Sequence, residues 1–246
     1  MESGMRKARY KVTHTLCSRP DHEAIVCVDV EDREKRECLI NVYRAGAAAR
    51  YVACFDSLRH CGEFRGMFLA DGALNAVFAL CGGKPIDEVF YRGADIAWQT
   101  RLRFAEELFH LGLAISDFPA EIACAAMLSE NLRVFPEENR VGVNYVVAPV
   151  DWASQREAAL LAADQAKKIL LRRFSSPKEE IRFLDGLEAG AFQTPVALYA
   201  YWQANKSAIW QDYERLYAKP SLGRALYLFF QTIARWFKRK LKARKG

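Results

Sequence analysis

The chain has 246 residues, of which 51% are hydrophobic and 27% charged, a balance that excludes a disordered protein and fits one large domain or two joined lobes. No apolar run is long enough to span a bilayer, and the start, MESGMRKARYKVTH, has no signal-peptide core, so we expect neither a spanning helix nor export by that route. The seven scattered cysteines have no C-x-x-C spacing, which favours a reduced cytoplasmic location and argues against a metal site.

Charge is unevenly distributed along the chain. Glu214 is the last acidic residue, and residues 215–246 carry ten Lys and Arg, a net of +10. Subtracting these ten from the total of 36 leaves 26 basic against 30 acidic residues in residues 1–214, a net of −4. An acidic body therefore precedes a strongly basic tail, which is the main electrostatic feature of the sequence.

Residues 1–83 have the pattern of a β-rich unit. The segments YKVTHTL, AIVCVDV and ECLINVY alternate and are rich in β-branched residues, which predicts three strands. RYVACFDSLRHCGEF predicts a short helix, and GMFLADG with LNAVFAL predicts a hairpin around Asp71-Gly72. The Gly-Gly-Lys-Pro of CGGKP predicts a hinge after these elements.

Residues 84–214 change to a helical periodicity. A helical face is predicted for Leu102, Ala105, Leu108, Phe109, Gly112 and Ile115. Next come a short loop in CAAMLSEN and two strands in LRVF and RVGVNY. Three helices are then predicted in DWASQREAALLAADQAKKILLRRF, SSPKEEIRFLDGLEAG and PVALYAYWQANKSAIWQDYERLYA.

This order of elements resembles the protein kinase fold. The resemblance implies an α+β, bilobal architecture with a β-rich N-lobe (1–83), a helical C-lobe (84–214) and a basic amphipathic C-terminal tail (215–246). It rests on element order and spacing, and it covers roughly residues 10–205. In that family, phosphoryl transfer depends on a glycine-rich loop, a strand lysine, a loop Asp and two metal-binding residues.

At the positions that match these motifs, the chemical groups are different. CSRPDHEA, between the first two strands, has no glycine, and Asn41 of ECLINVYR stands where the resemblance implies the lysine. CAAMLSEN has Cys-Ala-Ala in place of His-Arg-Asp, and only its Asn131 matches a metal-ligating position. The Asp-Phe-Gly triplet corresponds to Asn144-Tyr145-Val146, or starts one residue later, and neither register has the acid. Glu63 is the candidate for the helix glutamate that pairs with the lysine.

The sequence therefore predicts a catalytically inactive, kinase-like (pseudokinase) scaffold or regulatory protein that binds a protein partner. No catalytic residue and no cofactor are expected, and Asn41, Asn131 and Asn144 would line a degenerate nucleotide cleft. Taken alone, each Asn is also consistent with a turn residue or a satisfied buried amide. The alternative is an atypical ATP-dependent phosphotransferase with relocated acids, for which Asp151 is the candidate.

The basic tail has the pattern of a membrane-surface helix, with a bulky apolar stripe and a cationic end. The residues expected to contact an anionic membrane are Phe229, Phe230, Arg235, Trp236, Phe237, Lys238, Arg239 and Lys240. The protein would then be peripheral at the inner face of the membrane. Three alternatives remain open: the tail docks on a partner helix, the stripe packs on the helical lobe, or the tail binds nucleic acid. The acidic body and the absence of a motif disfavour the last.

Overall fold

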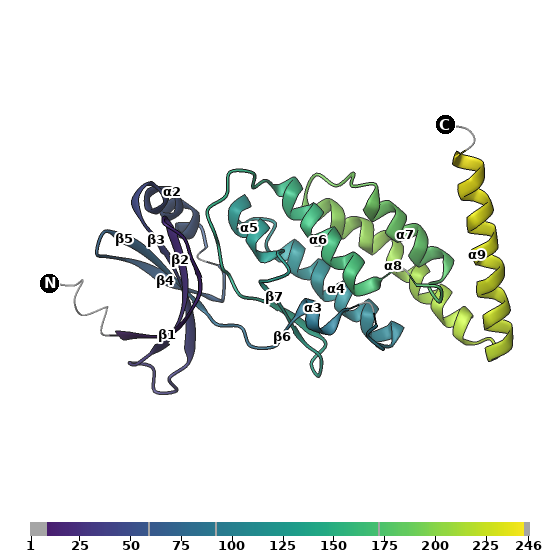
Figure 1. Ribbon diagram of the computed structural model, residues 1–246, viewed down its shortest axis with the longest axis horizontal. Coiled ribbons are helices and arrows are strands. Elements are labelled where there is room, and N and C mark those ends of the chain that lie inside the picture. Colours follow the sequence, from purple (N-terminus) through teal and green to yellow (C-terminus); the bar gives the residue numbers. More distant parts are fainter. Residues whose placement is uncertain (1–8, 59, 92, 172, 244–246) are drawn as a thin grey trace.

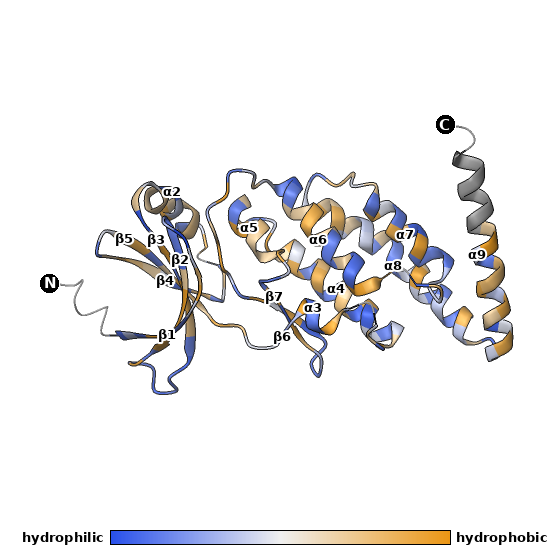
Figure 2. Ribbon diagram, viewed as in Figure 1, coloured by the Kyte–Doolittle hydropathy of each residue, from blue (hydrophilic) through white to orange (hydrophobic). Residues whose placement is uncertain are grey.

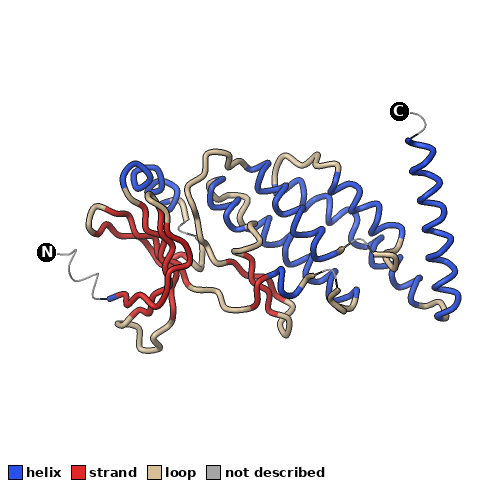
Figure 3. The backbone as a smooth tube through the Cα atoms, viewed as in Figure 1, coloured by secondary structure: helices blue, strands red, loops and turns tan. Residues whose placement is uncertain are grey.

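The computed structural model describes residues 9–58, 60–91, 93–171 and 173–243, with side chains described up to residue 234. Figure 1 shows two lobes and a last helix that projects from the far end, and Figure 3 shows strands in the first lobe and helices in the second. The first lobe contains β1 (Tyr10–Ser18), β2 (His22–Asp29), β3 (Glu37–Tyr43), α2 (Ala45–Asp56), β4 (Phe64–Ala70) and β5 (Ala73–Ala79). The second contains β6 (Lys84–Pro85), α3 (Ile86–Val89), α4 (Trp98–Ala114), α5 (Ala120–Ala126), β7 (Leu132–Phe135), β8 (Arg140–Val143), α6 (Gln155–Leu170), α7 (Lys178–Glu188) and α8 (Pro195–Tyr217).

The first lobe is an antiparallel sheet with the strand order β1-β2-β3-β5-β4. The predicted hairpin around Asp71-Gly72 is confirmed, because these two residues connect β4 to β5 with φ values of 51° and 72°. Positive φ at both central residues is the requirement of a type I′ turn, whose twist matches that of the flanking strands. The local sequence therefore determines the register of this hairpin.

The sheet is strongly curved, so that its edge strands β1 and β4 are in contact. Tyr10 of β1 stacks on Phe68 of β4, with ring centroids 5.9 Å apart and planes 7° apart. The inner face is filled by mostly small apolar residues: Cys27, Cys38, Ile40, Val42, Ala73 and Val77. The opposite face, which includes Leu39, Asn41 and Tyr43, is buried against α2 and the second lobe.

Side-chain caps mark the start of two helices of the second lobe, α6 and α8. Ser154 caps α6, since its Oγ accepts the backbone N–H of Glu157 at 3.1 Å. Thr194 caps α8 in the same way, and Pro195 occupies its first turn. The predicted apolar face of α4 is confirmed, because Leu102, Ala105, Leu108, Phe109, Gly112 and Ile115 are all buried.

The expected loop in CAAMLSEN is partly wrong. Its first three residues, Cys124, Ala125 and Ala126, form the last turn of α5. Helix α5 is rich in alanine, the residue with the highest helix propensity, and it begins directly after Pro119. The loop is therefore limited to the residues between Met127 and Asn131.

Apolar packing continues across the junction of the two lobes. Leu39 and Phe78 of the sheet belong to the same buried cluster as Tyr145, which follows β8, and Trp202 of α8. Phe78 stacks on Tyr145 with ring centroids 5.1 Å apart. The segment after β8 is thus held against the sheet by side-chain packing as well as by the hydrogen bonds described below.

The last helix, α9 (Ser221–Ala243), follows α8 after a short connection and projects away from the second lobe (Figure 1). Four of its large apolar side chains are at least half solvent-exposed, whereas Leu228 is buried: Leu222 (74%), Leu226 (50%), Phe229 (53%) and Phe230 (64%). Arg235, Trp236, Phe237, Lys238, Arg239 and Lys240 lie within α9, but their side chains are outside the described residues. A search of the described helices finds none with the length and hydrophobicity that crossing a membrane requires.

Candidate functional site

Asn41 joins the two lobes through its side-chain amide. It lies on β3 with no solvent exposure. Its Nδ2 donates a hydrogen bond to the carbonyl of Tyr145 at 2.8 Å, and its Oδ1 accepts the backbone N–H of Val147 at 2.9 Å. The amide therefore satisfies one donor and one acceptor of the segment that follows β8, as a neighbouring strand would do.

His22 completes the surroundings of Asn41. Its Nε2 lies 3.1 Å from Asn41 Oδ1, which already accepts a backbone bond, so we assign the ring proton to Nε2 as the donor. Nδ1 is then free to accept the thiol hydrogen of Cys17, whose sulfur lies 3.8 Å away. Burial lowers the pKa of His22, so the ring stays neutral near pH 7 and brings no positive charge to this position.

Asn144 binds the segment after β8 to the stretch that links β5 to β6 between the two lobes. Its Oδ1 accepts the backbone N–H of Cys81 at 2.7 Å. The backbone at Gly142 lies close to Cys81, since a Cβ added to Gly142 would lie 2.5 Å from the Cys81 sulfur. Gly83, with φ of 82°, could not carry a side chain without approaching the carbonyl of Val134 to 2.9 Å.

Asn131 fixes the start of the segment from the other side. Its Nδ2 donates to the carbonyls of Ala125 at 2.7 Å and Val146 at 3.0 Å. Its own backbone carbonyl accepts the N–H of Asn144 at 2.8 Å. Asn131 therefore joins the end of α5 to the segment after β8.

The three predicted asparagines thus converge on one stretch of backbone, residues 144–147. Each is at most 5% exposed, and the side-chain bonds to that stretch or to Cys81 use amide atoms that a ligand would otherwise need. Their side-chain amides form hydrogen bonds to the backbone and do not point into a shared ligand cavity. Buried amides in this arrangement stabilise a single conformation of the segment.

Two tyrosines that the sequence interpretation overlooked belong to the same arrangement. The hydroxyl of Tyr43 donates to the carbonyl of Val147 at 2.5 Å, and that of Tyr51 donates to Ala148 at 3.4 Å. Burial raises the pKa of Tyr43 well above its ordinary value, so its hydroxyl remains a donor. The alternation of β3 places Tyr43 on the face of Asn41, which was the available signal for its role.

The acidic residues considered from the sequence lie elsewhere. Glu63 is not on a helix: α2 ends at Asp56, and Glu63 lies in the turn before β4, so its assignment as the helix glutamate is wrong. Asp151 is exposed, and its carboxylate accepts from Arg50 of α2 at 2.8 Å, while Glu121 binds the same guanidinium at 3.2 Å. Within the described residues, no group of three or more His, Cys, Asp or Glu side chains could hold a metal ion.

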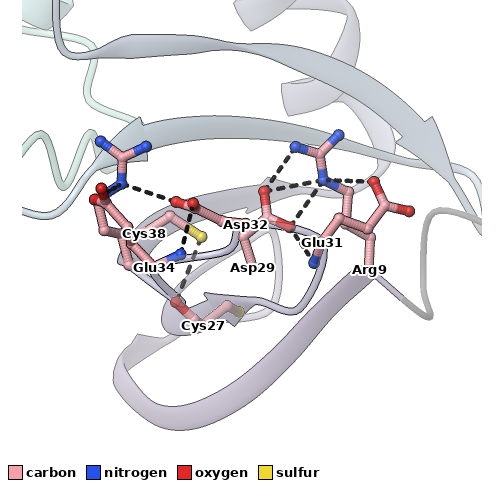
Figure 4. Close-up of polar contacts among 8 residues, drawn as sticks. Arg9, Cys27, Asp29, Glu31, Asp32, Glu34 and Cys38 are labelled. Atoms are coloured by element: carbon pink, nitrogen blue, oxygen red, sulfur yellow. Dashed lines mark hydrogen bonds and ion pairs between the residues drawn. The ribbon is translucent and has the colours of Figure 1, made fainter.

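A second surface feature lies at one end of the curled sheet, where a groove of about 880 Å³ has a charged rim. Figure 4 shows that the rim charges are arranged in ion pairs. Arg9 donates to Asp29 at 2.6–3.0 Å and lies 3.4 Å from Glu31, and Arg36 lies 2.8 Å from Asp32. Because these acids and bases neutralise one another, the rim has no concentrated charge of either sign to attract a ligand.

No protein-family model and no curated protein sequence matches the chain. Among solved structures, Rad53 1–466 in complex with AMP-PNP matches with a TM-score of 0.52 and 9% identity, over 78% of this chain and 64% of that one. The apo GRMZM2G135359 pseudokinase matches with a TM-score of 0.50 and 10% identity, over 80% of this chain and 92% of that one. The chain thus has the bilobal protein kinase-like fold that the sequence predicts, and similarity at this level of identity concerns the fold alone.

Proposed function

We propose that this chain is a catalytically inactive, kinase-like scaffold that binds a protein partner, and that α9 holds it at an anionic membrane surface. The observation that carries the first part is that Asn41 and Asn131 bind the backbone of residues 145–147 and that Asn144 binds the backbone of Cys81. The likeness to a pseudokinase fold agrees with this proposal.

The chemistry of phosphoryl transfer supports the absence of catalysis. Transfer requires positive charge at the phosphates and carboxylates that hold magnesium ions. At the three corresponding positions the chain has neutral amides, and the nearest titratable ring, that of His22, is kept neutral by burial. Binding ATP with magnesium would therefore require breaking the bonds that fix the segment after β8.

The test is thermal unfolding with and without ATP and Mg²⁺, combined with a radiolabel-transfer assay. We expect no metal-dependent change in midpoint and no labelled acceptor. The alternative, a phosphotransferase that uses Asp151, predicts both, with transfer lost in Asp151→Asn. Transfer by the wild-type chain that this substitution abolishes would refute the scaffold proposal.

The exposed apolar face of α9 supports membrane binding. Burial of one large apolar side chain contributes roughly 1.5–3 kcal/mol, and Leu222, Leu226, Phe229 and Phe230 are all at least half exposed in the structure. Basic residues near an anionic leaflet add about 1 kcal/mol each, and the tail carries ten Lys and Arg. These contributions are sufficient for reversible adsorption after the cost of ordering is subtracted.

Vesicle co-sedimentation separates the apolar from the electrostatic contribution. Phe230→Glu and Gln231→Glu each add one negative charge at neighbouring positions, but only the first removes an exposed aromatic side chain. We expect the first substitution to abolish sedimentation with phosphatidylserine vesicles and the second to weaken it only slightly. Equal loss in both variants would show that charge alone holds the protein, and binding to neutral vesicles would contradict the anionic preference.

The state of the cysteines supports a cytoplasmic location. All seven are free thiols in the structure, and four of them are buried. Burial raises the pKa of Cys27 to about 11 and that of Cys38 to about 12, which keeps both protonated and unreactive. A reducing compartment maintains such thiols, and the inner face of a membrane borders one.

A further inference from the structure

A groove between α4 and α8 forms a second recognition surface, distinct from the junction of the lobes. Its volume is about 390 Å³. The residues that line it are Leu102 and Glu106 of α4 and Trp202, Lys206, Ser207, Trp210, Gln211 and Glu214 of α8. We call this set the α4/α8 groove. Both walls are long helices packed against the core, so the groove is held by a rigid part of the second lobe.

The groove has a hydrogen-bond donor without an acceptor and an excess of negative charge. Trp202 is 2% exposed, and its indole N–H has no hydrogen-bond acceptor among the described residues. Buried donors without acceptors are uncommon in folded proteins, so this N–H is an unsatisfied group beside the groove.

The charge of the groove is also unbalanced. Lys206 pairs with Glu106 at 2.6 Å, while the carboxylate of Glu214 accepts from Trp210 at 2.8 Å and pairs with no Lys or Arg that the structure describes. The acids therefore outnumber the base by two to one. The groove combines the apolar side chains of Leu102, Trp202 and Trp210 with a net negative charge, and it fits a segment that is apolar and cationic.

The chain itself contains a segment of that chemistry. The face of α9 formed by Leu222, Leu226, Phe229 and Phe230, which we call the α9 face, is exposed, and the helix that carries it is strongly basic. Figure 2 shows apolar residues along the part of α9 that is coloured, and Figure 1 shows this helix directed away from α4. A monomer rarely leaves such a face uncovered in water.

We propose that, away from a membrane, the α4/α8 groove of one molecule receives the α9 face of a second copy of this chain. The exchange can be reciprocal, because each copy offers one groove and one helix, and a reciprocal exchange closes into a two-fold dimer. In the dimer, the basic side of α9 lies near Glu214. Binding to lipid uses the same face of α9, so vesicles compete with dimer formation.

The test is analytical ultracentrifugation of the full chain without lipid over a range of concentrations. We expect a monomer–dimer equilibrium that Phe230→Glu weakens by roughly tenfold or more, since it places a charge in the interface. Glu214→Lys and Ser207→Lys bring positive charge to the groove, and both positions are exposed, so the fold tolerates them. We expect each to weaken the dimer to a similar extent.

Matched controls share the charge change but lie outside the interface. Gln231→Glu changes α9 next to Phe230, and Glu137→Lys reverses a charge in the exposed turn between β7 and β8. Both controls should dimerise as the wild type does. A wild-type chain that is monomeric at every concentration would overturn the proposal, as would a dimer sensitive to Phe230→Glu but indifferent to both groove substitutions.

The outcome is separable from that of membrane binding. Glu214→Lys and Ser207→Lys leave α9 intact, so they should sediment with phosphatidylserine vesicles at least as well as the wild type does. If the wild-type chain dimerises through the groove and ignores vesicles, the membrane proposal fails and the groove proposal stands. If it binds vesicles and never dimerises, the reverse holds.

Discussion

Replacing Asn41 with leucine tests whether this residue joins the lobes. Leucine has a similar volume but offers no hydrogen bond. The substitution removes the partners of three buried groups: the carbonyl of Tyr145, the N–H of Val147 and the Nε2–H of His22. An unsatisfied buried polar group costs about 1–3 kcal/mol, so we expect a loss of roughly 3–6 kcal/mol after partial relaxation.

For a chain of this length, 1 kcal/mol shifts the melting temperature by about 2–4 °C, so a loss of about 3–6 kcal/mol predicts a decrease of roughly 6–24 °C. Asn75→Leu is the matched control, because its amide bonds only to Ala73 of its own strand, at 3.2 Å, and we expect it to cost under about 1 kcal/mol. Hydrogen exchange gives a local readout, since the amide of Val147 should lose its protection in Asn41→Leu alone. Equal melting temperatures for the two variants would refute the role assigned to Asn41.

Three further predictions concern other buried positions. Burial raises the pKa of Glu180 from 4.5 to about 7, so between these pH values the native state retains a proton that the unfolded chain has lost. The contribution of this carboxyl to the free energy of unfolding therefore falls by about 3 kcal/mol from pH 4.5 to 7. In Glu180→Gln, the free energy of unfolding should depend less steeply on pH across that range. Gly83→Ala should cost about 2 kcal/mol or more in urea unfolding because of its positive φ and the nearby carbonyl of Val134, whereas Gly82→Ala, whose added Cβ meets only one ring atom at 4.0 Å, should be tolerated. Tyr43→Phe leaves one buried carbonyl without its donor and should lower the melting temperature, with a cost of about 1–2 kcal/mol.

Local chemistry explains which parts of the fold were predictable. The turn at Asp71-Gly72 needs positive φ at both residues, and few sequences permit it, so the sequence identifies the hairpin. Ser154 and Thr194 cap their helices through bonds to residues only three positions away. Such features depend on near neighbours in the chain, and reading them requires no knowledge of tertiary contacts.

The function of the three asparagines depends on distant residues and could not be predicted in the same way. Asn41 binds a backbone more than 100 positions later in the chain, and no sequence pattern records that pairing. The resemblance to kinases pointed to three positions that the fold brings to the same junction. It gave the wrong location for Glu63, since α2 ends at Asp56, and the sequence does not fix where that helix stops relative to the sheet.

Placing a lysine at position 41, as the kinase motif requires, would need other changes at the junction of the lobes. A lysine at Asn41 would place an ammonium group in a site with no solvent exposure, and α2 offers it no carboxylate there: its buried side chains are Tyr51 and Phe55. An unpaired buried charge costs several kcal/mol, and the N–H of Val147 would still lack its acceptor. Restoring the cation therefore requires a new acid on α2, and the acid requires removal of the stack in which Tyr51 lies 4.5 Å from Tyr43. Because each step alone is destabilising, we expect that no single substitution at this junction places a stable cation at position 41.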